Sequence, residues 1–78
     1  MDLTFHGSDD VACEAFILAI NRWAFDNEKQ EDDRLVAQFA YSHMAGKMLR
    51  FYETLDDDVQ GSWKLLRRAL LDRYPPTE

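Results

Sequence analysis

The sequence predicts an all-α fold, a small bundle of four helices, or of five, preceded by a short extended segment. Apolar residues recur every three or four positions in several successive stretches, which is the spacing of one helix face. Clusters of Asp precede these stretches, where carboxylates cap exposed backbone N–H groups. Only three Gly and two Pro leave little material for turns, while five Phe, three Tyr and two Trp supply a dense core.

A chain of 78 residues has room for one core, so we expect a single domain over residues 1–78. Residues 1–8 are expected to be extended, because Leu3 and Phe5 alternate with polar neighbours. Residues 9–74 form the predicted bundle. Residues 75–78 are expected to begin a linker, since Pro75 and Pro76 disfavour helical geometry in the residue before each of them.

The first helix is expected from about Val11 to Phe25, after Asp9 and Asp10 at its N-terminus. Its main apolar stripe consists of Ala12, Phe16, Ala19, Ile20 and Trp23. Ile17, Leu18 and Phe25 fall outside this stripe. Such a helix either lies at the centre of the bundle or has a second face that awaits a partner.

The second helix is expected over about 32–44, and its apolar stripe contains Leu35, Val36, Phe39, Ala40 and His43. A third is expected over 47–55, with Met48, Phe51, Tyr52 and Leu55. Gly46 falls between these two stripes. We interpret it as a residue that terminates a helix, because glycine adopts a positive φ angle or permits close approach of another backbone.

The last helix is expected to follow the acidic triplet at 56–58 and to end near Arg73. Its stripe is the most regular in the chain and consists of Val59, Trp63, Leu66, Leu70 and Tyr74. The basic residues of this helix, Lys64, Arg67, Arg68 and Arg73, would suit RNA, an acidic partner or a neighbouring copy. We favour a solvated face opposite the apolar stripe.

The composition argues against several classes of partner. The net charge of −6 opposes binding to a phosphate backbone, so no direct nucleic-acid partner is expected. No apolar run is long enough to cross a bilayer, and the N-terminus lacks the pattern of a signal peptide. The single cysteine, Cys13, has no cysteine with which to form an internal disulfide. These features favour an intracellular, cytoplasmic protein.

No arrangement of residues predicts catalysis, a metal or a cofactor. The acidic runs at 31–33 and 56–58 lack the spacing of a calcium-binding loop, and capping explains them. His6 and His43 stand 37 positions apart, and His43 lies on an apolar stripe. Ser62 lies in the first turns of a helix, where local hydrogen bonding accounts for it. We therefore expect that the protein is not an enzyme.

Two short patterns resemble a known family. The first places Met44, Gly46, Met48 and Phe51 where the family has a large apolar residue, Gly, a small or apolar residue and an aromatic. The second consists of Trp63, Leu66, Leu70 and Tyr74. Together with FILAINRWAF upstream, these resemble the capsid (gag) domain of gypsy-type long-terminal-repeat retrotransposons, and the N-terminal lobe of the domesticated gag protein Arc. The likeness covers residues 5–74, although Met48 and Phe51 depart from the usual small residue and Trp.

The resemblance implies a capsid-lobe bundle in which Gly46 lies at the junction of the second and third helices. It also implies that Phe51 packs inward while Tyr52 lies at the edge. The expected core residues are Phe16, Ile20, Trp23, Phe39, Gly46, Met48, Phe51, Leu55, Trp63, Leu66 and Leu70. The candidate contacts to a peptide or subunit are Leu3, Thr4, Phe5, His6, Ile17 and Tyr52.

Two functions follow as hypotheses. The first is a gag-derived capsid-like module that interacts with proteins and self-assembles, either in a retroelement or domesticated. The surplus apolar residues of the first helix motivate it. The second is a domesticated adaptor lobe that binds a short peptide in a hydrophobic groove beside residues 3–6, through added-strand hydrogen bonds. The partner is then another copy of the chain, or a peptide or protein.

Overall fold

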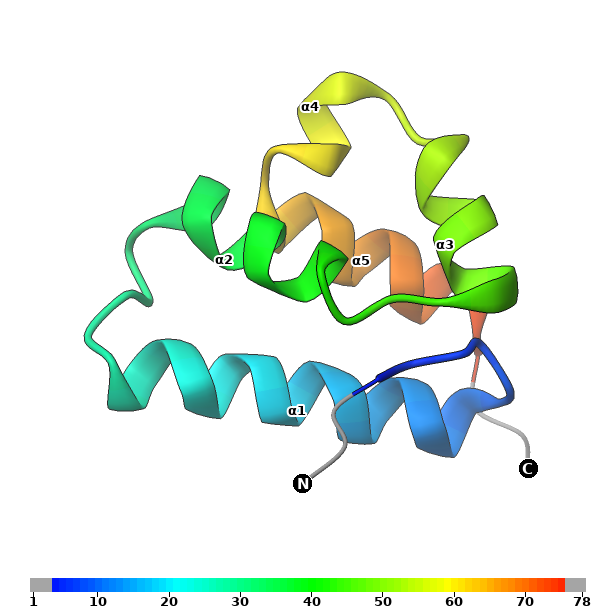
Figure 1. The fold of residues 1–78 in the computed structure, drawn as a ribbon, viewed down its shortest axis with the longest axis horizontal. Coiled ribbons are helices and arrows are strands. Elements are labelled where there is room, and N and C mark those ends of the chain that lie inside the picture. Colours follow the sequence, from blue (N-terminus) through cyan, green and yellow to red (C-terminus); the bar gives the residue numbers. More distant parts are fainter. Residues whose placement is uncertain (1–3, 76–78) are drawn as a thin grey trace.

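The computed structural model describes residues 4–75, and within them the fold is all-α, as predicted. The five helices are α1 (Asp10–Asp26), α2 (Asp33–Tyr41), α3 (Gly46–Glu53), α4 (Asp57–Gln60) and α5 (Trp63–Arg73). Helix α5 packs against α1, α2 and α4, so it occupies the centre of the bundle. Helix α1 runs along one edge of the molecule, with the other helices on one side of it (Figure 1).

The predicted acidic caps hold for the first two helices. The Asp9 carboxylate accepts a hydrogen bond from the Ala12 N–H at 2.8 Å, and Asp32 accepts one from Leu35 at 3.2 Å. Asp56 stands at the N-cap of α4 but makes no side-chain capping bond. Each bonded carboxylate satisfies a backbone donor that the helix leaves unpaired.

The single last helix that the sequence predicted is two helices, α4 and α5, which is why the bundle has five. The helix is interrupted at Gly61 and Ser62, where Ser62 adopts an extended conformation with φ −130°. The Ser62 hydroxyl caps α5 by accepting from the Leu65 N–H at 3.3 Å, and it donates to the Asp33 carboxylate at 2.5 Å. Asp33 also accepts from the Lys64 N–H at 3.3 Å, so one carboxylate joins the starts of α2 and α5.

The role predicted for Gly46 was wrong in one respect. Helix α2 ends at Tyr41, before the expected residue 44, and Gly46 is the first residue of α3. Its φ of +58° confirms the need for glycine. Crowding is not the reason, because a Cβ at Gly46 would meet only the His6 carbonyl oxygen at 3.8 Å.

Of the segment expected to be extended, residues 4–8 are described; they form no helix, and Phe5 pairs with the linker between α2 and α3. The Phe5 N–H donates to the His43 carbonyl at 2.8 Å, and the Ala45 N–H donates to the Phe5 carbonyl at 3.0 Å. These bonds form a parallel bridge between Phe5 and Met44. A segment far away in the sequence thereby closes one side of the core.

The core contains most of the residues that the sequence assigned to it. Phe16, Ile20, Met48, Trp63, Leu66 and Leu70 are buried. Trp23, Phe39, Phe51 and Leu55 are half-buried and pack against the cluster. The rings of Trp23 and Phe39 stack with their centroids 3.8 Å apart. Gly46 is exposed, because it belongs to the surface turn that begins α3.

The expected orientations of Phe51 and Tyr52 are reversed. Tyr52 is 8% exposed and belongs to the core, whereas Phe51 is half-buried. Tyr52 has polar partners at both ends, since its hydroxyl donates to the Gln60 carbonyl at 3.2 Å and its own carbonyl accepts from the Gln60 amide at 2.8 Å. The Phe51 ring lies instead at the edge, 5.8 Å from the Arg73 guanidinium.

Replacing glycine at positive φ should destabilise the fold by amounts that depend on the surrounding space. We expect Gly46→Ala to lower the free energy of unfolding by about 1 kcal/mol through backbone strain alone. Gly7→Ala should cost about 2 kcal/mol or more, because φ is +77° and the added Cβ would lie 2.5 Å from the Tyr74 hydroxyl. Urea denaturation measures both. Gly61→Ala, at φ −91°, is the control and should change stability by less than about 0.5 kcal/mol.

Candidate functional site

The most prominent apolar surface is the outer face of α1. Val11, Leu18 and Phe25 are 70%, 65% and 67% exposed, and they succeed one another at intervals of seven residues. Seven residues are nearly two helical turns, so the three side chains lie in one line along the helix, here called the outer stripe. Exposed apolar residues that share one helix face make it a candidate contact surface.

The opposite face of α1 explains why the outer stripe is left outside. Cys13, Phe16, Ile17, Ile20 and Ala24 are its buried residues. The Asn21 side chain accepts a hydrogen bond from the Trp63 indole at 2.7 Å, which sets the rotation of α1 relative to α5. With this face committed to the core, the outer stripe points away from the bundle. The sequence placed Ile17, Leu18 and Phe25 off the main stripe and left open whether α1 is central or has a second face. Leu18 and Phe25 are exposed, whereas Ile17 belongs to the core.

Helix α1 ends at Asp26 and continues into a compact turn. The Glu28 N–H donates to the Phe25 carbonyl at 3.1 Å, and the Lys29 N–H donates to the Ala24 carbonyl at 2.7 Å. Glu28 takes the left-handed conformation with φ 55°, so the pattern is a Schellman motif in which glycine is more usual. The turn keeps Phe25 within regular helix.

A small pocket of about 330 Å³ lies beside Phe25, between α1, α2 and α5. Its lining combines apolar and polar residues: Asn21, Ala24, Phe25, Gln30, Val36, Trp63 and Arg67. It extends the apolar surface at the end of the outer stripe towards α5.

The N-terminal segment does not leave an open groove. Phe5 is 3% exposed, and its ring stacks on Phe16 with centroids 5.1 Å apart and meets Tyr74 edge-on at 5.6 Å. The Tyr74 hydroxyl donates to the Gly7 carbonyl at 3.3 Å. Phe5 therefore fills the apolar space beside Phe16 and Tyr74 itself.

The other residues named as candidate contacts are scattered. Thr4 and His6 are exposed on either side of Phe5, whereas Ile17 and Tyr52 are buried. Leu3 lies outside the described residues. The structure thus does not gather these residues into one surface. Val11, Leu18 and Phe25 were not among the candidate contacts, although their spacing of seven residues was a visible signal.

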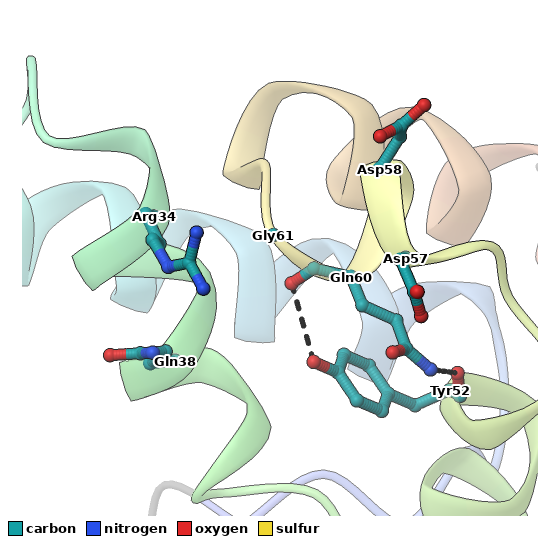
Figure 2. A pocket seen from close by; sticks show the side chains of 7 residues that line it. All are labelled: Arg34, Gln38, Tyr52, Asp57, Asp58, Gln60 and Gly61. Atoms are coloured by element: carbon teal, nitrogen blue, oxygen red, sulfur yellow. Dashed lines mark hydrogen bonds between the residues drawn. The ribbon is translucent and has the colours of Figure 1, made fainter.

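A second, polar pocket of about 430 Å³ lies between α2 and the α3–α4 region (Figure 2). Arg34 and Gln38 line it from α2, while Asp57 and Asp58 line it from α4. Tyr52 and Gln60, which are joined by two hydrogen bonds, also line this pocket. Burial raises the pKa of the Tyr52 hydroxyl, so the neutral phenol is the form that bonds to Gln60.

Metal binding and membrane spans can both be assessed within residues 4–75. No group of three or more His, Cys, Asp or Glu side chains is arranged to hold a metal ion. No described helix has the length and apolarity that a membrane span needs. His43 packs at 4.7 Å from the Phe39 ring, in line with the packing role expected for it.

The basic residues of α5 are distributed on its outer side. Lys64, Arg68 and Arg73 are exposed and Arg67 is half-buried. The Arg73 guanidinium lies 5.5 Å from the Tyr74 ring, besides its contact with Phe51. Trp63, Leu66 and Leu70 occupy the opposite, buried face, which agrees with the amphipathic pattern predicted for this helix.

Comparison of the chain with models of known protein families, with curated protein sequences and with solved structures gives no match. The likeness to gag capsid domains therefore stays a prediction from the sequence patterns.

Removing the Phe5 ring should show how much the N-terminal segment contributes to the core. We expect Phe5→Ala to lower the free energy of unfolding by about 3 kcal/mol, because it deletes a buried ring that contacts Phe16 and Tyr74. His6→Ala, at the exposed neighbouring position, should change it by less than about 0.5 kcal/mol. Chemical denaturation compares them. Equal effects would contradict the burial of Phe5.

Alkaline pH should weaken the fold through Cys13. Burial, with smaller contributions from Glu14 and Asp10, raises the pKa of this thiol from 9.0 to about 11. Between these values the unfolded chain loses the thiol proton while the folded chain retains it, so the free energy of unfolding should fall as pH rises from 9.0 to about 11. Denaturation at several pH values measures this slope. Cys13→Ala should have a shallower slope, and an unchanged slope would contradict the assignment.

Proposed function

We propose that this chain is a capsid-like lobe of the gag type that acts by protein–protein contact, and that it self-associates through the outer face of α1. The observation that supports the proposal is the outer stripe, formed by Val11, Leu18 and Phe25. Each is about two-thirds exposed in a chain whose other large apolar side chains mostly pack inward. Covering these side chains would remove apolar surface from water and favour association.

The charge of the molecule supports a protein partner rather than a nucleic acid. The net charge is −6, and the basic residues of α5 are accompanied by Asp72 on the same helix. We place the protein inside the cell, in the cytoplasm, in keeping with its single unpaired cysteine. Its gag-like character rests on the sequence patterns at 44–51 and 63–74.

The alternative, a peptide-binding adaptor lobe, has weaker support. Its groove would have to form where Phe5 packs against Phe16 and where the Phe5 backbone bonds to His43 and Ala45. A peptide would therefore compete with the chain's own segment. The hydrogen bonds and the ring contact of that segment would have to be lost before the peptide gained its own.

Self-association through α1 should depend on Leu18. We expect the apparent mass in sedimentation or light scattering to rise with concentration up to several hundred micromolar, and Leu18→Glu to abolish that rise by placing a charge within the outer stripe. The stability of this exposed variant should change by less than about 0.5 kcal/mol. Leu71→Glu is the matched control, since Leu71 is 46% exposed on α5, and it should associate like the parent chain.

A wild-type chain that stays monomeric throughout the series would argue against the proposal. So would equal loss of association in the Leu18 and Leu71 variants, because the effect would then be one of net charge alone.

A further inference from the structure

The outer stripe has a symmetry that says how a second copy would bind, if the proposed self-association is correct. Leu18 stands at its centre, with Val11 seven residues before it and Phe25 seven residues after it. Two charged residues, both exposed, stand four residues to either side: Glu14 before and Arg22 after. The apolar positions are therefore symmetric about Leu18, while the charges at equal distances from it are opposite.

That pattern suits two α1 helices that cross in antiparallel orientation at a two-fold axis. Such an axis reverses the helix direction, so a residue before Leu18 in one copy lies level with one equally far after Leu18 in the other. Leu18 then meets Leu18 of the second copy, and Val11 meets Phe25 of the second copy. Glu14 lies level with Arg22 of the second copy, and the axis generates the same pair a second time.

The side chains between these positions allow the charged pair to form. At 100° per residue, Glu14 and Arg22 lie about 40° to opposite sides of Leu18, so an Arg side chain must reach across the contact. Ala15 lies on the side where Arg22 of the second copy enters, and its small side chain leaves space for the guanidinium. A parallel pair would instead place Glu14 against Glu14 and Arg22 against Arg22, which is unfavourable for like charges.

The remaining charges of α1 do not oppose this arrangement. Asp10 and Asp26 stand eight residues to either side of Leu18, about 80° from it around the helix and on opposite flanks, so they do not meet across the axis. Asp26 also lies one turn after Arg22 on the same helix, and it competes for that guanidinium within one copy.

We infer that the partner of the outer stripe is a second copy of this chain, bound by an antiparallel contact between the two α1 helices with the two-fold axis at Leu18 and with reciprocal Glu14–Arg22 pairs. The 17 residues of α1 extend over about 25 Å. A single helix pair of this length buries less surface than a permanent dimer, so the contact is weak and forms at high micromolar concentration.

Cysteine cross-linking tests the symmetry directly. Packed helices lie about 8–10 Å apart, which leaves facing Cα atoms about 3.5–5.5 Å apart and within reach of a disulfide. Under mild oxidation, Leu18→Cys should give a covalent dimer by itself. Val11→Cys and Phe25→Cys should each cross-link at least tenfold less alone, but should form a heterodimer when mixed. Wild type is the control, because Cys13 is fully buried.

Charge reversal gives an independent test. Glu14→Arg should weaken self-association about tenfold, since it places two like charges level with each other in each of two symmetric pairs. The double variant Glu14→Arg with Arg22→Glu should regain an affinity within about threefold of the wild type. Sedimentation equilibrium measures all three chains.

The outcomes separate this inference from the proposed function. If Leu18→Glu abolishes association but the mixed Val11 and Phe25 variants do not cross-link, the surface is correct and the antiparallel two-fold contact is overturned. If the double charge variant stays as weak as the single one, the Glu14–Arg22 pairing is overturned. If the wild type never associates, both the inference and the proposed function fail.

Discussion

Burial of one face of α5 is the interaction on which the rest of the structure depends. Trp63, Leu66 and Leu70 form this face, and α1, α2 and α4 pack around the helix that carries it. Each such side chain contributes about 1.5–3 kcal/mol when removed from water. The Trp63 indole also bonds to Asn21 of α1. That contact orients α1 with its Leu18 face outward, so the core determines which residues are left for a partner.

Much of the fold could be predicted because its signals are local. The capping positions of Asp9 and Asp32 and the periodic apolar residues identify the helices from short stretches of sequence. The break in the last predicted helix was missed because the run of apolar positions continues through it. Ser62 ends that continuity by bonding to Asp33, which is 29 residues away. No local pattern contains that partner.

The candidate site likewise has features that local sequence predicts and features that depend on distant contacts. Helical spacing alone placed Leu18 and Phe25 off the main stripe of α1, but it placed the buried Ile17 there too and left open whether a second face exists. The burial of Phe5 and the inward position of Tyr52 depend on contacts between distant segments. Phe5 pairs with the linker after α2, and Tyr52 is held by Gln60. The family pattern assigns the inward position to Phe51. It does not include the two hydrogen bonds with Gln60 that hold Tyr52 in that position instead.

The contact between Phe5 and Tyr74 joins two positions near opposite limits of the described chain. The Tyr74 hydroxyl also bonds to the Gly7 carbonyl, so a ring contact and a hydrogen bond hold these segments together. Tension applied through the backbone at these two points would act on this ring contact and hydrogen bond before it acts on the helices. Mechanical opening would therefore begin with release of the N-terminal segment, which would expose the Phe16 ring that Phe5 covers.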